Sequence, residues 1–63
     1  MNIDDLINRR KKSGLSRRKL SKIIGYSVIW ITMFENEGER RVSKDFIEKY
    51  RNTVKRYEKM LKG

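Results

Sequence analysis

The sequence contains no cysteine, no histidine and no proline, and only four glycines in 63 residues. Without cysteine there are no disulfides, and without cysteine or histidine the common zinc sites are excluded. No apolar run approaches the ~18 residues of a membrane-spanning helix. A chain this short forms one domain and buries only about 60% of the surface that it exposes when unfolded. We therefore expect a single domain over residues 1–63, with no metal, no cofactor and no membrane span, that gains further burial from a partner chain.

The same absences bear on location and on catalysis. The segment from Met1 to Asp5 lacks the charged and apolar regions of a secretory signal, which predicts a cytoplasmic protein. Without histidine or cysteine, the acidic residues are few and mostly adjoin basic ones, so no acid–base pair stands out. The sequence therefore predicts a binding protein, not an enzyme.

The charge of the chain is concentrated in one segment. The net charge is +9, from 17 basic and 8 acidic residues. Between Arg9 and Lys22 there is no acid, and the basic residues are Arg9, Arg10, Lys11, Lys12, Arg17, Arg18, Lys19 and Lys22. Solubility alone is one interpretation of this composition. A field concentrated in this way attracts a polyanion, with nucleic acid first and an anionic membrane second.

Serine, asparagine and glycine divide the first part of the chain into two short helices. One runs from a cap at Asn2 to a stop at Gly14, and the next from a cap at Ser16 to Gly25. Their predicted buried faces are Ile3, Leu6 and Ile7, then Leu20, Ile23 and Ile24. The cations that follow Ser16 oppose the helix dipole. A bound phosphate would reverse that effect, or the side chains extend into water.

The segment 27–36 has the β-branched and aromatic composition of a strand. No second strand is available to pair with it, so we predict a helix that begins at Ser27. Ile31, Phe34 and Glu35 then fall on one helical face, and Ile31 and Phe34 face inward. The outward face consists of Val28, Ile29, Thr32 and Met33.

The last segment is predicted to be one long helix over residues 43–62, capped by Ser43. Apolar residues recur in it at intervals of three and four: Ile47, Tyr50, Val54, Tyr57 and Leu61. Such a stripe is first of all core. A helix of ~28 Å is longer than the domain beneath it, which predicts a homodimer through Tyr50, Val54, Tyr57 and Leu61. The fold expected is all-α, with three short helices and one long C-terminal helix.

Helix, glycine-containing turn and helix form a helix-turn-helix motif. The runs Gly14-Leu15-Ser16-Arg17-Arg18-Lys19-Leu20-Ser21, Ile24-Gly25-Tyr26-Ser27, Ile31-Thr32 and Phe34-Glu35-Asn36 resemble those of the lambdoid phage repressor and Cro family. The resemblance implies a turn at Tyr26 and Ser27 and a recognition helix over residues 28–36. It also implies an ion pair between Arg10 and Glu35. The chain departs from the family in its displaced Gly38, in Val42 at a common proline position, and in its single long last helix.

The function expected from this resemblance is a phage or mobile-element transcription regulator, repressor-like, that binds a pseudo-palindromic DNA operator as a dimer. The predicted contacts to the DNA backbone are Arg17, Arg18, Lys22, Ser27 and Arg41. The predicted base-reading residues are Val28, Ile29, Thr32 and Met33, which would pack on thymine methyls. The first alternative is a protein-interaction module, antirepressor or antitoxin-like, that uses the same apolar helix face. A third interpretation places residues 44–62 on an anionic membrane as a basic amphipathic helix.

Overall fold

The computed structural model describes residues 2–62, and those residues form helices joined by short turns. The elements are α1 (Ile3–Lys12), α2 (Arg17–Ile24), α3 (Val28–Glu37), the short 3-10 helix η1 (Glu39–Arg41) and α4 (Lys44–Lys62). The predicted all-α fold of three short helices and one long one is confirmed.

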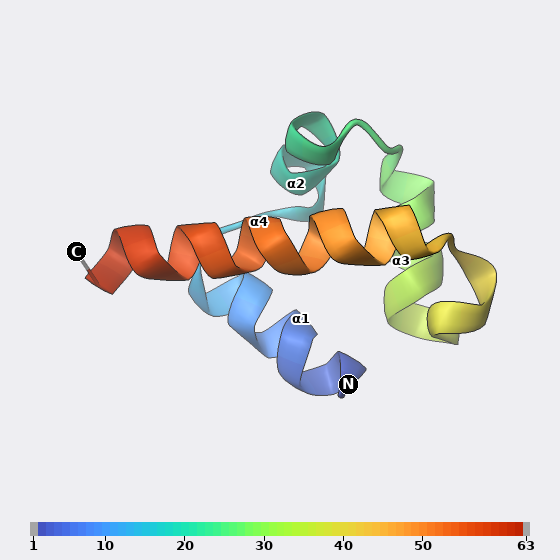
Figure 1. Cartoon of the computed structure of the whole chain (residues 1–63), viewed down its shortest axis with the longest axis horizontal. Coiled ribbons are helices and arrows are strands. Elements are labelled where there is room, and N and C mark those ends of the chain that lie inside the picture. Colours follow the sequence, from blue (N-terminus) through green and yellow to red (C-terminus); the bar gives the residue numbers. More distant parts are fainter. Residues whose placement is uncertain (1, 63) are drawn as a thin grey trace.

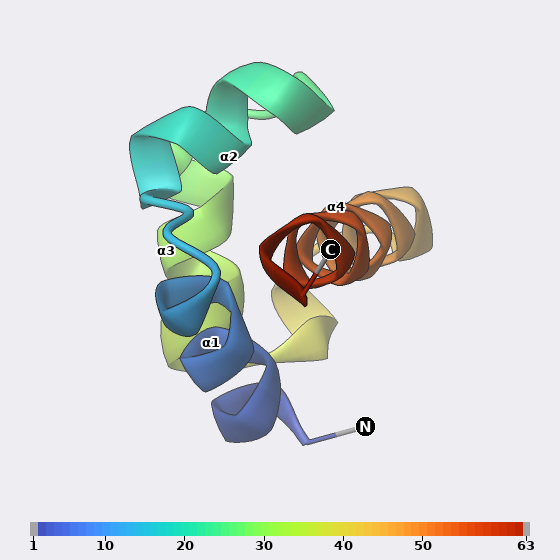
Figure 2. The same cartoon turned by 90° about the vertical axis from the view of Figure 1, so that its left-hand side faces the viewer.

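Helix α4 organises the other elements. It lies along the longest axis of the molecule, with α3 near its first turns and the C-terminal end of α4 at the far end of that axis (Figure 1). A view along α4 shows α1, α2 and α3 together on one side of it (Figure 2). The three short helices and α4 enclose the core between them.

The helix boundaries follow the capping residues that the sequence indicates. The side chain of Asn2 accepts from the Asp4 backbone N–H at 3.0 Å, Ser16 accepts from Lys19 at 3.1 Å, and Ser43 accepts from Phe46 at 3.2 Å. Each cap satisfies an N–H that a helix start leaves unpaired. These three predicted caps are confirmed. Ser27 occupies the N-cap position of α3, but its side chain makes no capping hydrogen bond.

Among the described residues, the core contains nine buried apolar side chains: Leu6, Leu15, Leu20, Ile24, Ile31, Phe34, Phe46, Tyr50 and Val54. The predicted inward faces supply most of them. The prediction for Ile23 is wrong, because this side chain is 41% exposed. It lies about 100° around α2 from Ile24, away from the side that packs on the core.

The central part of the apolar stripe of α4 is core within a single chain. Phe46, Tyr50 and Val54 are 0% exposed. The predicted dimer contacts at Tyr50 and Val54 are therefore wrong, because α1, α2 and α3 already cover the stripe along most of α4. The same burial contradicts the membrane interpretation, since the apolar face of residues 44–62 is mostly inside the domain. Tyr57 is partly buried against the core, and Leu61 is 66% exposed.

Candidate nucleic-acid interface

The turn between α2 and α3 is fixed by contacts on both of its sides. Gly25 ends α2 with φ of 78°, the left-handed conformation that glycine adopts without steric cost. The Ser21 hydroxyl then donates to the Tyr26 carbonyl. The Tyr26 ring lies 5.2 Å from that of Phe46 on α4, and its hydroxyl donates to Asp45 at 2.7 Å. This hydrogen bond lowers the pKa of Asp45. Helices α2 and α3 are thus held in one orientation.

Helix α3 has one buried face and one exposed face, as predicted. Ile31 and Phe34 are 0% exposed and lie in the core. Ile29 is 69% exposed and Val28 is 39% exposed, while Met33 is partly exposed. An isoleucine exposed to this degree, next to further apolar side chains, is typical of a surface that binds a ligand or a partner.

Two polar side chains also belong to the outward face of α3. The Thr32 hydroxyl donates to the Val28 carbonyl at 3.0 Å, so its oxygen remains only as an acceptor. Asn36 is exposed, and its amide has no hydrogen-bond partner among the described residues. Asn36 is not among the residues predicted for the outward face, although it follows Ile29 by seven residues, which is close to two helical turns. That spacing is the signal that would have found it.

The basic segment between Arg9 and Lys22 is partly neutralised inside the fold. Arg9 donates to both carboxylate oxygens of Glu58, at 2.9 and 2.7 Å, and this pairing raises the pKa of Arg9. Arg10 and Arg17 pair with Glu35, and Lys19 lies over the ring of Tyr57. The other four basic residues have no partner in the described part of the chain: Lys11, Lys12, Arg18 and Lys22. Their charges are available to an external anion.

The predicted ion pair between Arg10 and Glu35 is present. Arg10 Nε lies 2.8 Å from Glu35 Oε2, and the exposed fractions of the two side chains are 5% and 2%. Arg10 also donates to the Leu15 carbonyl at 2.7 Å. The Tyr50 hydroxyl donates to Glu35 at 2.6 Å. This network joins α1, the turn before α2, α3 and α4. Each of its hydrogen bonds pairs polar atoms that burial would otherwise leave without a partner.

Arg17 is the second cation on the same carboxylate. Its Nε lies 3.0 Å from Glu35 Oε1, and its side chain is 43% exposed. Because the single carboxylate of Glu35 faces two arginines, one of the two positive charges is not balanced within this cluster of three side chains. The terminal nitrogens of Arg17 keep free N–H donors at the start of α2, where backbone N–H groups also favour an anion.

The remaining residues predicted to contact phosphate lie on exposed surface. Arg18 and Lys22 are four residues apart on α2 and share one face of it. The Ser27 hydroxyl is exposed, and no capping hydrogen bond occupies it. Arg41, in η1, is paired with Glu37 at 3.2 Å, but its side chain is 63% exposed. The structure therefore leaves all five predicted phosphate contacts accessible, with Arg17 and Arg41 shared with an acid.

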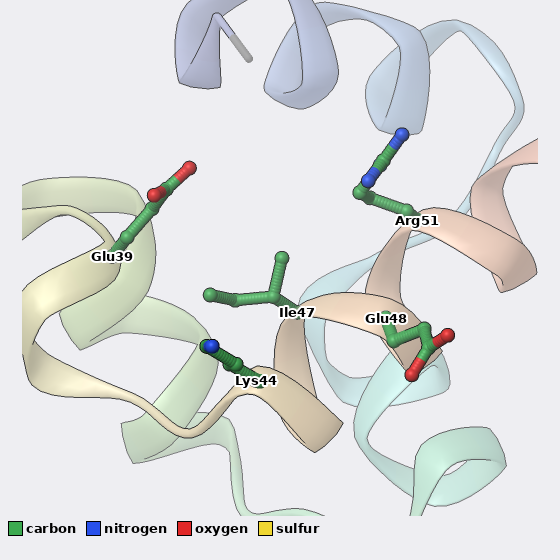
Figure 3. A pocket seen from close by; sticks show the side chains of 5 residues that line it. All are labelled: Glu39, Lys44, Ile47, Glu48 and Arg51. Atoms are coloured by element: carbon green, nitrogen blue, oxygen red, sulfur yellow. The ribbon is translucent and has the colours of Figure 1, made fainter.

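A shallow hollow between η1 and the first turns of α4 contains none of these residues. Its lining consists of Glu39, Lys44, Ile47, Glu48 and Arg51, around a volume of about 400 Å³. Figure 3 shows Glu39 and Arg51 on opposite sides of this hollow. Two acids and two bases give it no net charge, so it is a poor match for a polyanion.

Comparison with known proteins adds no relative. No protein-family model, no curated protein and no solved structure matches the chain. Within residues 2–62, no helix is long and apolar enough to cross a membrane. The same residues include no group of three or more metal-binding side chains of the histidine, cysteine, aspartate or glutamate type.

Proposed function

We propose that the protein is a sequence-specific DNA-binding regulator of transcription, repressor-like, in which α3 enters the major groove. The observation that carries the proposal is the exposed outer face of α3. A fixed turn holds this face beside α2, which has unpaired cations. Two helices joined by a glycine-containing turn are the arrangement by which this motif presents its second helix to DNA.

Phosphate contacts supply affinity in this proposal. Arg18 and Lys22 have no acidic partner among the described residues, and Arg17 has free donors at the start of α2. Each phosphate that they neutralise releases counterions, which favours binding at low salt. Ser27 and Arg41 add donors from the turn before α3 and from η1.

Base contacts supply specificity. The side chains of Val28, Ile29 and Met33 carry no hydrogen-bond donor and no strong acceptor, so they distinguish bases by packing on the thymine methyl group in the major groove. The Thr32 oxygen accepts from an exocyclic amino group, because its proton is held by Val28. Asn36 adds an uncommitted amide to the same face. An operator half-site rich in thymine is the DNA that this surface fits.

The operator is proposed to be pseudo-palindromic, with one copy of the chain on each half-site. The two recognition helices would then lie about 34 Å apart, in successive major grooves on one side of the duplex. Because Tyr50 and Val54 are buried, neither can lie at the contact between two copies.

A second function rests on the same exposed face. Val28 and Ile29 are exposed apolar side chains on α3, and exposed apolar surface is of the kind that binds another protein. Such a protein-interaction module, of antirepressor or antitoxin type, would not need the free cations of α2. The unpaired cations of α2 therefore favour the DNA-binding function over this second one.

Titration of the isotopically labelled protein with a random-sequence DNA duplex tests the proposal. We expect changes in the backbone amide chemical shifts of α2 and α3, centred on Arg18, Lys22 and Ile29. These changes should become smaller as the salt concentration is raised. Shifts confined to α4 and η1, or no binding at low salt, would contradict it.

A further inference from the structure

The side of α4 that faces away from the other helices carries unpaired positive charge in its second half. Helices α1, α2 and α3 all lie on one side of α4 (Figure 2). Lys55, Arg56 and Lys59 are exposed, and they lie about 140°, 120° and 180° around the helix from the buried Tyr50. We name these three residues the outer basic face. None of them has a partner in the described part of the chain.

The acids of α4 do not neutralise the outer basic face. Asp45, in the first turn, pairs with Lys49 at 3.3 Å. Glu48 lines the hollow beside η1, two helical turns before the outer basic face begins. Glu58 is bound by Arg9 of α1 at 2.7 Å, so its carboxylate is turned toward α1. Within residues 2–62, the outer basic face thus has three positive charges and no acid of its own.

The position of these cations in the helix does not account for them. The dipole of a helix favours cations near its C-terminus, but only within the last turn. Lys59 lies in that turn, whereas Lys55 precedes the end of α4 by about two turns. Lys55 and Lys59 are also four residues apart, and like charges at this spacing repel each other. An anion that contacts both side chains would remove that repulsion.

The phosphate backbone of a nucleic acid is the anion that fits this face. Lys55 and Lys59 are about 6 Å apart along the helix axis. A duplex carries a phosphate every ~3.4 Å along each strand, so it supplies an anion for each cation. An acidic protein is a poorer match, because lysine is depleted in protein–protein interfaces, whereas protein–DNA interfaces are strongly positive. An anionic membrane is also a poorer match, because the apolar face of α4 is mostly inside the domain.

The outer basic face and the outward face of α3 lie on different sides of the domain. Helix α3 packs on α4 through Phe34, whose ring centre lies 5.0 Å from that of Tyr50. Ile29 lies about 140° around α3 from Phe34, and Lys59 lies about 180° around α4 from Tyr50. A straight duplex that contacts Ile29 therefore does not reach Lys59.

We propose that the outer basic face binds the phosphate backbone of a second nucleic-acid segment, distinct from the segment that α3 reads. One chain then connects two segments of DNA, one on α2 and α3 and the other on α4. The connection of two segments rests on the proposed function, whereas the binding of phosphates to α4 is measured by itself.

Titration of the isotopically labelled chain with an excess of random-sequence duplex observes the two surfaces separately. At ~0.05 M salt we expect the amide chemical shifts of Lys55, Arg56 and Lys59 to change, in addition to those of α2 and α3. Three phosphate contacts correspond to a slope of about 2.7 in log affinity against log salt. Raising the salt concentration fourfold should therefore weaken binding at α4 by about 40-fold.

Lys55→Glu identifies the contact. This side chain is exposed, so the variant should fold normally. It should bind the duplex at α4 about tenfold or more weakly, because one phosphate contact is lost and a repulsive charge is added. Lys44→Glu is the matched control, with the same change of charge at an exposed position of α4 about 17 Å away along the axis. It should respond as the unaltered chain does.

Capture of a fluorescent duplex on an immobilised duplex by the protein tests the connection of two segments. The unaltered chain and Lys44→Glu should retain the fluorescent duplex at ~0.05 M salt, and Lys55→Glu should not. Retention that Lys55→Glu leaves unchanged, or no retention by the unaltered chain, would overturn the inference.

The titration also distinguishes this inference from the proposed function. Changes on α2 and α3 with none on α4 would overturn the inference and leave the proposed function intact. Changes on α4 alone would support phosphate binding there and contradict the proposed function. If polyglutamate changes the α4 shifts and the duplex does not, the inference is overturned and the outer basic face belongs to an acidic protein.

Discussion

The guanidinium of Arg10 and the carboxylate of Glu35 form an ion pair in which both side chains are almost entirely buried, at 5% and 2% exposure. Both partners also bond to the Tyr50 hydroxyl. A buried pair of this kind is costly to break, because the remaining charge has no access to water. Glu35 is in addition the acid that holds Arg17 at the start of α2.

Replacing Glu35 therefore destabilises the fold more than replacing any other acid of α3. Glu35→Ala leaves Arg10 buried without its counter-charge, and we expect a loss of about 3–5 kcal/mol in the free energy of unfolding. The control is Glu37→Ala, which breaks the exposed pair with Arg41 and should cost under about 1 kcal/mol. Urea denaturation measures both variants. Equal losses would show that burial of the pair contributes nothing to stability.

Tyr50 makes stability sensitive to alkaline pH. Burial, followed by its hydrogen bond to Glu35, raises the pKa of Tyr50 above the ordinary value of 10.0. Below that value the hydroxyl is protonated in both the folded and the unfolded chain. Above it, only the unfolded chain ionises, so this contribution to stability is lost as pH rises, by up to about 1.4 kcal/mol per pH unit.

The comparison with Tyr50→Phe isolates this effect, since both proteins share every other titrating group. The difference in unfolding free energy between the two should be constant below pH 10 and should shrink above it. A difference that stays constant through pH 11 would mean that Tyr50 ionises equally in the folded and unfolded chains.

Lys22 separates electrostatic attraction from base reading. Lys22→Ala should weaken binding to all duplexes alike, and the slope of log affinity against log salt should fall by about one unit. Arg51→Ala removes the same charge from the hollow beside η1 and should leave the slope unchanged. Lys22 is a cleaner probe than Arg17, because Arg17→Ala also breaks a contact with Glu35. An unaltered slope for Lys22→Ala would show that this lysine only contacts solvent.

The fold could be predicted from local signals, whereas the burial of individual side chains could not. The caps at Asn2, Ser16 and Ser43 and the stop at Gly25 act within a few residues, so the sequence indicates them directly. The outward position of Ile29 followed from helical periodicity.

The features that the sequence did not indicate are contacts between distant segments of the chain. The spacing of Tyr50 and Val54 is the same in a core and in a dimer seam, and only the packing of α1 and α2 shows which one applies. Likewise, the pairing of Arg9 with Glu58 joins residues 49 positions apart, and no local pattern indicates it. These contacts decided how much of the basic segment is free for an anion.

The apolar face of α3 can be tested by removing single methyl groups from DNA. Uracil in place of a contacted thymine should weaken binding by ~0.8 kcal/mol per buried methyl. Ile29→Ala should weaken binding to the thymine site and abolish the sensitivity to uracil at the base that Ile29 contacts. Its melting temperature should barely change, because the side chain is 69% exposed. If Ile29→Ala keeps full DNA affinity but loses a protein ligand, the face is a protein-binding surface.

The most direct test of DNA recognition is selection of bound sequences from random duplex DNA at physiological salt. We expect an enriched pair of inverted half-sites with thymines at the contacted positions and centres about one helical turn apart. Ile29→Ala, run in parallel, should lose the preference at one of those thymines. Recovery of unenriched, random sequences by the unaltered protein would contradict the proposal that α3 reads DNA.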